Sequence, residues 1–360
     1  MKRDCAGVVT DQTGSPLPHK RRVRYSGKYP RRFEEKYKEH APARYAETVA
    51  KVLSAGRTPA GMHRPIMLAE VLRALAPKPG EVAVDCTLGF AGHAQELLAH
   101  IQPGGRLLGL DTDPLELPKA EARLRSLGYG PEVFTARRAN FAGLQRALWE
   151  VGMQAADLIL ADLGVSSMQL DDPARGFSMK KEGPLDMRMN PQRGQPASVV
   201  LAGIRPESLQ RLLQENADEP HAAGLAAALA GKLFPSTTAL ARAVREALPR
   251  LDKQARDDCV RRVFQALRIA VNDEFSALEA FLRQVPACLN PGGRVAVLSF
   301  HSGEDRRVKK SFEANWRAGV YAEISGVLRA SAEERRANPR STPAKLRWGR
   351  KGGNLRGTES

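Results

Sequence analysis

The stretch EVAVDCTLGFAGHAQELLAHI, residues 81–101, decides the fold class of this chain. An apolar run ends at Asp85, a loop containing Gly89 and Gly92 follows, and an amphipathic helical pattern then takes over. Strand, glycine-bearing loop and helix in this order are typical of a parallel α/β sheet. Glycines at such a turn let the backbone approach a ligand at the helix N-terminus, although a purely structural turn would use the same residues.

The same rhythm continues on both sides of this stretch. Residues 65–75 form an amphipathic helical pattern, and strand patterns follow at 104–114, 131–141 and 156–164 with helical patterns between them. Short strands that alternate with helices indicate a doubly wound sheet. We therefore predict an α/β fold built on a parallel, Rossmann-like sheet.

The rhythm breaks after Leu170. Residues 171–198 are loop-like, a long Ala- and Leu-rich helical pattern follows, and strand character returns at 291–302. This order predicts an all-helical domain inserted into the α/β domain. The predicted organisation is a basic N-terminal extension at 1–60, an α/β domain at 61–171 and 269–325, an inserted helical domain at 172–268, and a basic C-terminal tail at 326–360.

The net charge of +16 is concentrated at the two ends of the chain. Residues 1–60 hold 14 Lys and Arg against 6 Asp and Glu, and residues 301–360 hold 14 against 7. Basic arms suit a polyanion because Lys and Arg displace phosphate counterions, but solvated tails would have the same composition. Aromatic residues among the N-terminal cations could stack on bases or pin a short helix onto the body.

Several classes of protein do not fit the composition. The chain has no apolar run long enough to span a membrane, and its polar N-terminus lacks the apolar segment of a secretory signal. The cysteines form no CxxC pair, which argues against a zinc site and against a disulfide framework. We therefore expect a cytoplasmic protein with no membrane segment and no metal.

Carboxylates end three of the predicted strands. Asp85, Asp111 and Asp162 each follow an apolar pattern, and ligands of such sheets lie beyond the carboxyl ends of the strands. We expect all three to point into one crevice. Asp111 is well placed to accept hydrogen bonds from ribose hydroxyls, because Asp113 before Pro114 is the better helix cap. Carboxylates that come one per strand fit a ligand with several polar parts better than a metal.

The ligand predicted for this crevice is a nucleoside without a pyrophosphate. The loop reads GFAG and lacks the G-x-G-x-x-G fingerprint of a dinucleotide site, which makes a nicotinamide-dependent dehydrogenase remote. S-adenosyl-L-methionine is a ligand of the required kind. Phe141 follows the third strand, where its ring could face an adenine or simply fill the core.

Several stretches of the chain resemble the RsmH (MraW) family. They are HRPIMLAEVL, DCTLGFAGHA, GLDTDP, ANF, DLGVSSMQLDDPARGFSMKKEGPLDMRMNPQRGQ, FQALRIAVNDE and LNPGGRVAVLSFHSGEDRRVK. The resemblance covers roughly residues 61–345, and its most specific part is the run from DLGVSS to PLDMRM. It implies a class I S-adenosylmethionine-dependent methyltransferase that modifies the exocyclic N4 of a cytidine in the decoding region of 16S ribosomal RNA.

The resemblance also implies which residues bind the methyl donor. They are Ala91, Gly92, His93, Asp111, Phe141, Asp162 and Gln169. The loop residues would run along the donor, Asp111 would take the ribose hydroxyls, and Phe141 would contact the adenine. The inserted domain would help to recognise 16S rRNA in the small ribosomal subunit. The oligomeric state stays open, with a homodimer among the options.

Methyl transfer mainly requires that amine, methyl group and sulfur are aligned. Asp162 and Ser166 lie at the strand end where they could bind the amine or a flipped base. Asp162 could equally serve the donor alone. His301 follows the last strand and could contact the base or a phosphate, but a helix cap by Ser302 explains the same sequence.

Arginines flank the specific motif and suit phosphate contacts. The candidates for RNA binding are Arg175, Arg188 and Arg193, and we expect Asp186 to pair with one of them.

The chain departs from the family pattern in three places. Ala91 stands where the family usually has glycine, NADEPHAAGLAAAL replaces a run with G-E-E and basic residues, and DDCVRRV replaces H-P-A-T-R. Two of these changes lie in the inserted domain. The same chemistry on a different RNA or DNA is therefore an alternative, and so is a non-catalytic RNA-binding ribosome-assembly factor, although such a factor has no need of a complete donor site.

Overall fold

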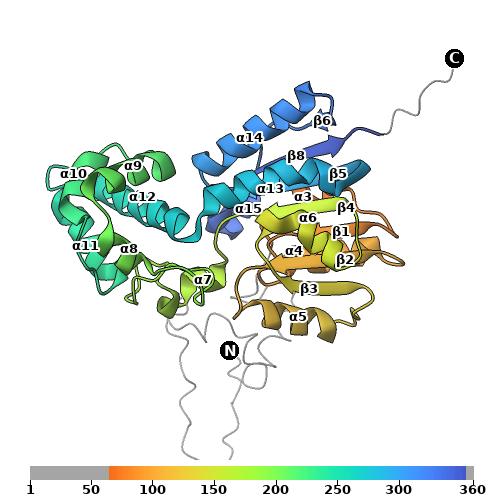
Figure 1. Cartoon of the computed structure of the whole chain (residues 1–360), viewed down its shortest axis with the longest axis horizontal. Helices are drawn as coiled ribbons and strands as arrows, with labels where there is room; N and C mark the ends of the chain where they lie inside the picture. Colours follow the sequence, from red (N-terminus) through yellow and green to blue (C-terminus); the bar gives the residue numbers. More distant parts are fainter. Residues whose placement is uncertain (1–64, 354–360) are drawn as a thin grey trace, which may run out of the picture. The chain divides into compact units, whose positions relative to one another are not determined.

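The computed structural model describes residues 65–353, so the extension predicted at 1–60 lies outside the described residues. Figure 1 shows a central sheet with helices on both faces. The described strands are β1 Val82–Asp85, β2 Arg106–Asp111, β3 Phe134–Arg138, β4 Ala156–Asp162, β5 Leu289–Ser299, β6 Tyr321–Ile324, β7 Leu328–Arg329 and β8 Lys345–Lys351. Their order is β3-β2-β1-β4-β5-β8-β6, and β7 pairs with β8.

The first five strands pair in parallel, whereas β8 runs antiparallel to both β5 and β6. The α/β class and the Rossmann-like sheet are confirmed, but the sheet is mixed and not wholly parallel as predicted. The strand order reverses between β1 and β4, which makes their carboxyl ends the expected place for a ligand.

Helices cover both faces because the central strands are apolar on both sides. In β4, the residues from Leu158 to Ala161 are all buried, which is typical of a parallel strand between two helical layers. One face packs against α3 Leu68–Leu75, α4 Gly92–Ile101 and α5 Leu117–Ser126. The other face packs against α6 Leu144–Glu150, α13 Glu274–Cys288 and α14 Ser302–Arg317.

The inserted segment packs around a separate apolar core. After the short helix α7 Ser167–Asp171 and an irregular stretch come α8 Ala197–Gly203, α9 Pro206–Ala217, α10 Ala222–Leu229, α11 Thr237–Ala247 and α12 Lys253–Asn272. Each presents an apolar stripe to the others, and the buried residues Leu213, Leu225, Leu240 and Leu267 meet in one cluster. No helix in the described range is long and apolar enough to cross a membrane.

The prediction that residues 326–360 form a C-terminal tail was wrong for the residues that the structure describes, 326–353. This part contains β7, the helix α15 Ala332–Ala337 and β8, which lies between β5 and β6 in the sheet. Leu346 is fully buried in the core, and Lys345 and Arg347 both bind Asp305 of α14, at 3.1 and 2.7 Å. The sequence of β8 is rich in basic residues, which is typical of a tail. Their acidic partner, Asp305, lies about 40 residues away in the sequence, so the pairing could not be predicted.

Candidate active site

A cavity of about 500 Å³ lies at the carboxyl ends of β1, β2 and β4. Asp111 and Asp162 line it, as do Gly92, His93 and Phe141. With Gln169, which lines the cavity as well, six of the seven residues predicted for donor binding meet there. A volume of this size is typical of small-molecule sites.

The carboxylate of Asp111 is held by the backbone around it. Its Oδ2 accepts a hydrogen bond from the Gly89 N–H at 2.8 Å, and its Oδ1 accepts one from the Asp113 N–H at 2.8 Å. Burial raises the pKa of Asp111 to about 6, so the group is mostly ionised at neutral pH. Each oxygen keeps a further lone pair, and the two oxygens can therefore accept the two hydroxyls of a ribose.

The loop before α4 uses a strained residue. Ala91 adopts φ 64° and ψ 26°, a left-handed conformation that costs a non-glycine residue about 1–2 kcal/mol. Its methyl group is buried in the core and does not line the cavity, which corrects the prediction that Ala91 runs along the donor. Gly92 is required by close packing, because a Cβ there would lie 2.7 Å from the Pro65 side chain.

His93 is neutral and presents a lone pair to Asp162. Its Nε2 lies 3.0 Å from the carbonyl oxygen of Ile66, which fixes the proton on Nε2. Burial lowers the pKa of His93 to about 4. The unprotonated Nδ1 then faces Asp162 Oδ2 at 3.6 Å, so the pair is not an ion pair, and a protonated Asp162 would suit this contact better than a carboxylate.

Asp162 has a strongly perturbed environment in the cavity. Its Oδ1 is buried and accepts no hydrogen bond within the described range. Burial, reinforced by the charges of Asp85 and Glu304, raises the pKa of Asp162 to about 8. Asp85 was expected in the same crevice, but it is buried and does not line the cavity. Its carboxylate accepts a hydrogen bond from the Thr87 N–H at 3.1 Å. The crevice therefore contains two of the three expected strand-end carboxylates.

Ser166 and Gln169 are held in place by each other. They form a capping box at the start of α7, in which each side chain accepts the backbone N–H of the other. The amide of Gln169 also donates to Asp113 Oδ2 at 2.8 Å. Both residues line the cavity, but these bonds give them a positioning role.

Arg175 cannot contact phosphate as predicted, because it is buried. Its guanidinium binds Asp113 at 2.7 Å and donates to the carbonyl oxygens of Arg188 and Met189. Arg188 pairs with Asp186 through two hydrogen bonds, as expected for Asp186.

Arg193 is exposed, and its side chain makes no hydrogen bond or ion pair within residues 65–353. It lines a second hollow of about 430 Å³ together with Arg138. This hollow shares Thr112, Asn140 and Met189 with the first cavity, so the two are continuous.

His301 caps a helix and does not line the cavity. Its Nδ1 accepts the Glu304 N–H at 3.4 Å, so His301 and not Ser302 is the cap of α14. Its Nε2 lies 3.1 Å from Glu304 Oε1. The prediction that His301 contacts the base or a phosphate is therefore not supported by its position.

Sequence reasoning missed part of the cavity wall. Arg268 of α12 binds Glu274 of α13 with two hydrogen bonds of 2.8 and 2.9 Å, and both line the cavity with Glu304. Pro339 and Arg340, from the supposed tail, line it too, and Arg340 binds Asp171 at 2.8 Å. Arg268 and Glu274 belong to the FQALRIAVNDE motif, and this motif is the sequence feature that could have identified them as residues of the cavity wall.

Phe141 occupies the position expected for a ring contact. It is half-buried at the cavity, and its ring meets that of Phe281 edge to face at a centroid distance of 5.5 Å. One face of the ring can therefore border a ligand while its edge is fixed by the core.

The mixed sheet, the crevice between β1 and β4, and the acid at the end of β2 define a class I, Rossmann-like methyltransferase that uses S-adenosyl-L-methionine. A family model agrees with this class. It is the model of the MraW methylase family, it matches residues 60–352, and the chain belongs to that family.

Named relatives are similar over most of their length. "Ribosomal RNA small subunit methyltransferase H 2" of Alkaliphilus metalliredigens is 48% identical, covering 91% of this chain and 96% of the relative. "Ribosomal RNA small subunit methyltransferase H" of Anaeromyxobacter sp. is 43% identical, covering 79% and 96%. Among solved structures, an S-adenosylmethionine-dependent O-methyltransferase from Thermotoga maritima matches 84% of this chain and 71% of its own at 10% identity, with a TM-score of 0.38.

Proposed function

We propose that this protein transfers the methyl group of S-adenosyl-L-methionine to the exocyclic N4 of a cytidine in the decoding (P-site) region of 16S rRNA. The observation that carries the proposal is the cavity of a methylase-family chain, which is lined by Asp111 at the end of β2 and Asp162 at the end of β4, on either side of β1. The relatives named as small-subunit rRNA methyltransferases support the substrate class. We expect the protein in the cytoplasm, where small subunits are assembled.

The residues present fit the donor. Asp111 offers two acceptor oxygens, oriented by backbone N–H groups, to the ribose hydroxyls. Phe141 borders the same cavity with a half-buried aromatic ring that suits the adenine. Asp162 adds an oxygen that lacks a partner among the described residues. When bound, S-adenosylmethionine supplies an electrophilic methyl group on a positively charged sulfur.

Asp162 is the residue that we assign to the target amine. The lone pair of cytosine N4 is delocalised into the ring, and an acceptor for the N4–H localises it for attack. With its pKa raised to about 8, Asp162 is mostly protonated at neutral pH. Its ionised form, which grows as the pH rises towards 8, is the form that accepts the N4 proton. The lone pair on His93 Nδ1, 3.6 Å away, orients that proton once Asp162 holds it.

Arg193 and Arg138 are our candidates for contacts with the RNA backbone. Both line the hollow that continues from the cavity, and both are exposed. A base that enters the cavity must be turned out of its stack, and its neighbouring phosphates would then lie over this hollow.

The test is a methylation assay on natural substrate. Purified protein is incubated with tritiated S-adenosylmethionine and small subunits from a strain that lacks the activity, and the digested RNA is resolved by mass spectrometry. Label in N4-methylcytidine at a decoding-region site is expected. Asp111→Ala should abolish this label, whereas Asp252→Ala, which removes a helix cap outside the cavity, should retain it.

The alternative target has one specific observation in its favour. The departures from the family pattern in the inserted domain, around Glu219 and Cys259, alter the region assigned to RNA recognition. If donor binding is intact and 16S rRNA takes no label, the proposed target is refuted and another nucleic acid is the substrate. If the protein does not bind S-adenosylmethionine, the proposal that it is a methyltransferase is refuted.

A further inference from the structure

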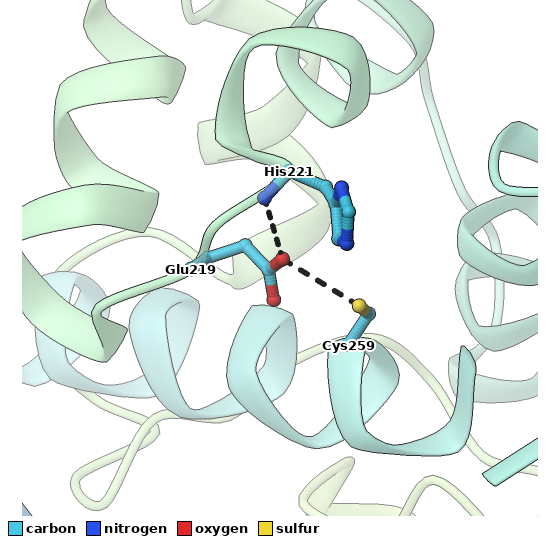
Figure 2. A group of neighbouring side chains, drawn as sticks. All are labelled: Glu219, His221 and Cys259. Atoms are coloured by element: carbon cyan, nitrogen blue, oxygen red, sulfur yellow. Dashed lines mark hydrogen bonds between the residues drawn. The ribbon is translucent and has the colours of Figure 1, made fainter. Parts of the chain in front are cut away.

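Three side chains with metal-binding atoms converge inside the helical insertion. Glu219 lies in the turn after α9, His221 precedes α10, and Cys259 lies in α12. Their ligand atoms lie within 4.8 Å of one another, and Figure 2 shows the three side chains facing a common space. Sequence spacing gave no sign of this group, because Cys259 has no CxxC partner and lies about 40 residues beyond the other two, in α12.

The bonds within this group leave polar atoms without partners. Glu219 is 2% exposed, and its Oε1 accepts hydrogen bonds from the His221 N–H at 2.9 Å and from the Cys259 thiol at 3.5 Å. Its Oε2 is buried and accepts no hydrogen bond within the described range. The His221 ring makes no hydrogen bond there either. A buried oxygen without a partner costs about 1–3 kcal/mol.

We propose that Glu219, His221 and Cys259 bind one Zn²⁺ ion, with a water molecule as the fourth ligand. A carboxylate, an imidazole and a thiolate together form a donor set that Zn²⁺ accepts, whereas Mg²⁺ and Ca²⁺ prefer oxygen alone. The Cys259 thiol gives up its proton to solvent as the Zn–S bond forms, and no electron is transferred.

The present separations already suit such a site. In a tetrahedral zinc site with ordinary Zn–S and Zn–O lengths, sulfur and oxygen lie ~3.6 Å apart. Glu219 Oε1 and Cys259 Sγ are 3.5 Å apart. The ligand nitrogen of His221 lies within 4.8 Å of the ligand atoms of both other residues, so a side-chain rotation can bring it to the same centre.

A hydrogen-bond network without metal explains the group less completely. In that arrangement the Cys259 thiol donates to Glu219, and Arg262, 3.6 Å from Glu219 Oε2, balances the charge. It gives the His221 ring no partner. It also leaves Oε2 without a hydrogen bond, because the guanidinium of Arg262 is 3.6 Å away and beyond bonding distance.

The ion would fix a turn that holds the insertion to the methyltransferase domain. Asp218, the residue before Glu219, binds Arg306 of α14 at 2.9 Å and accepts from the Ser302 hydroxyl at 3.2 Å. A metal that immobilises Glu219 and His221 would hold Asp218 in place for these bonds. This inference does not depend on the proposed rRNA target.

Metal content and cobalt spectroscopy test the site. The Cys5→Ser protein is used throughout, so that no thiol outside the described residues contributes. Elemental analysis is expected to find one equivalent of zinc. Co²⁺ added to the metal-free protein should give a thiolate-to-cobalt charge-transfer band and the strong visible bands of a tetrahedral site.

Matched variants decide whether these residues are the ligands. Cys259→Ser should remove the charge-transfer band, and His221→Gln should weaken Zn²⁺ binding by more than about 100-fold, since even outer-shell changes cost 10–100-fold. Cys288→Ser, which removes a buried thiol from a different core, should change neither.

His221 is only half-buried, so we expect His221→Gln to fold. It therefore tests the site even if Cys259→Ser fails to fold. Circular dichroism checks each fold. A wild type that binds no stoichiometric zinc, or a folded His221→Gln with unchanged affinity and an unchanged band, would overturn the inference.

Discussion

Replacement of Asp111 by alanine is the sharpest test of the donor site. In the structure both of its oxygens are already oriented by backbone N–H groups at 2.8 Å, so the side chain pays no ordering cost when a ribose binds. Hydrogen bonds to a charged acceptor contribute about 1.5–3 kcal/mol each. The loss of two such bonds would cost about 3–6 kcal/mol, and even the lower figure weakens binding by about 100-fold.

The measurement is titration calorimetry of S-adenosylmethionine and S-adenosylhomocysteine at pH 8. Asp252→Ala is the control, because its carboxylate also accepts a backbone N–H but lies in the insertion and does not line the cavity. Both variants should melt cooperatively. A folded Asp111→Ala protein with less than a threefold change in Kd would refute the ribose assignment, because no geometry that uses both oxygens could leave the affinity unaltered.

The pH dependence gives a second readout of the same carboxylate. Burial raises the pKa of Asp111 to about 6, and only the ionised form accepts with both oxygens. Wild-type affinity for the neutral S-adenosylhomocysteine should therefore fall as the pH drops from 8 to 5. This part of the pH dependence should be missing in Asp111→Ala.

Three further changes probe separate parts of the structure. Arg175→Ala should destabilise the protein by about 3–5 kcal/mol in urea unfolding, because it leaves the buried carboxylate of Asp113 without its cationic partner. Burial raises the pKa of Asp85 to about 7, so the folded state holds a proton that the unfolded state releases, and stability is lost as pH rises from about 4 to about 7. Asp85→Asn should flatten the slope of stability against pH in that same range. Arg193→Ala should weaken RNA binding and lower its salt slope by about one, with S-adenosylhomocysteine affinity unchanged.

The parts of the site that sequence could predict are those carried by local patterns. An acidic residue that ends an apolar strand lies at the carboxyl edge of a parallel sheet, where ligands bind. Asp111 and Asp162 could therefore be predicted as cavity residues from the sequence. The loop through Gly92 follows from the same rule. Its neighbour Ala91 shows the limit, since nothing local indicates that its methyl group turns into the core.

The parts that sequence could not predict depend on partners far away in the chain. Arg175 looks like a phosphate ligand until Asp113 is seen to bury it. β8 looks like a basic tail until Asp305 is seen to pair with its cations. A charged side chain carries no local sign of whether its counter-ion is solvent, nucleic acid or another residue of the fold.

The buried charges between the two domains explain how the insertion can be held at a fixed distance from the donor. Arg268 ends the insertion on α12 and binds Glu274 at the start of α13, while Glu304 at the start of α14 binds the Phe300 N–H and contacts His301. Burial alone would raise the pKa of Glu304, but His301 and Arg268 hold it below its usual range. Buried ion pairs add little net stability, yet breaking one is costly. They therefore favour the one arrangement of the insertion and the sheet domain in which these pairs are intact. Because this cluster lines the cavity next to Asp162, the arrangement that it favours also fixes the shape of the cavity on the side of the insertion.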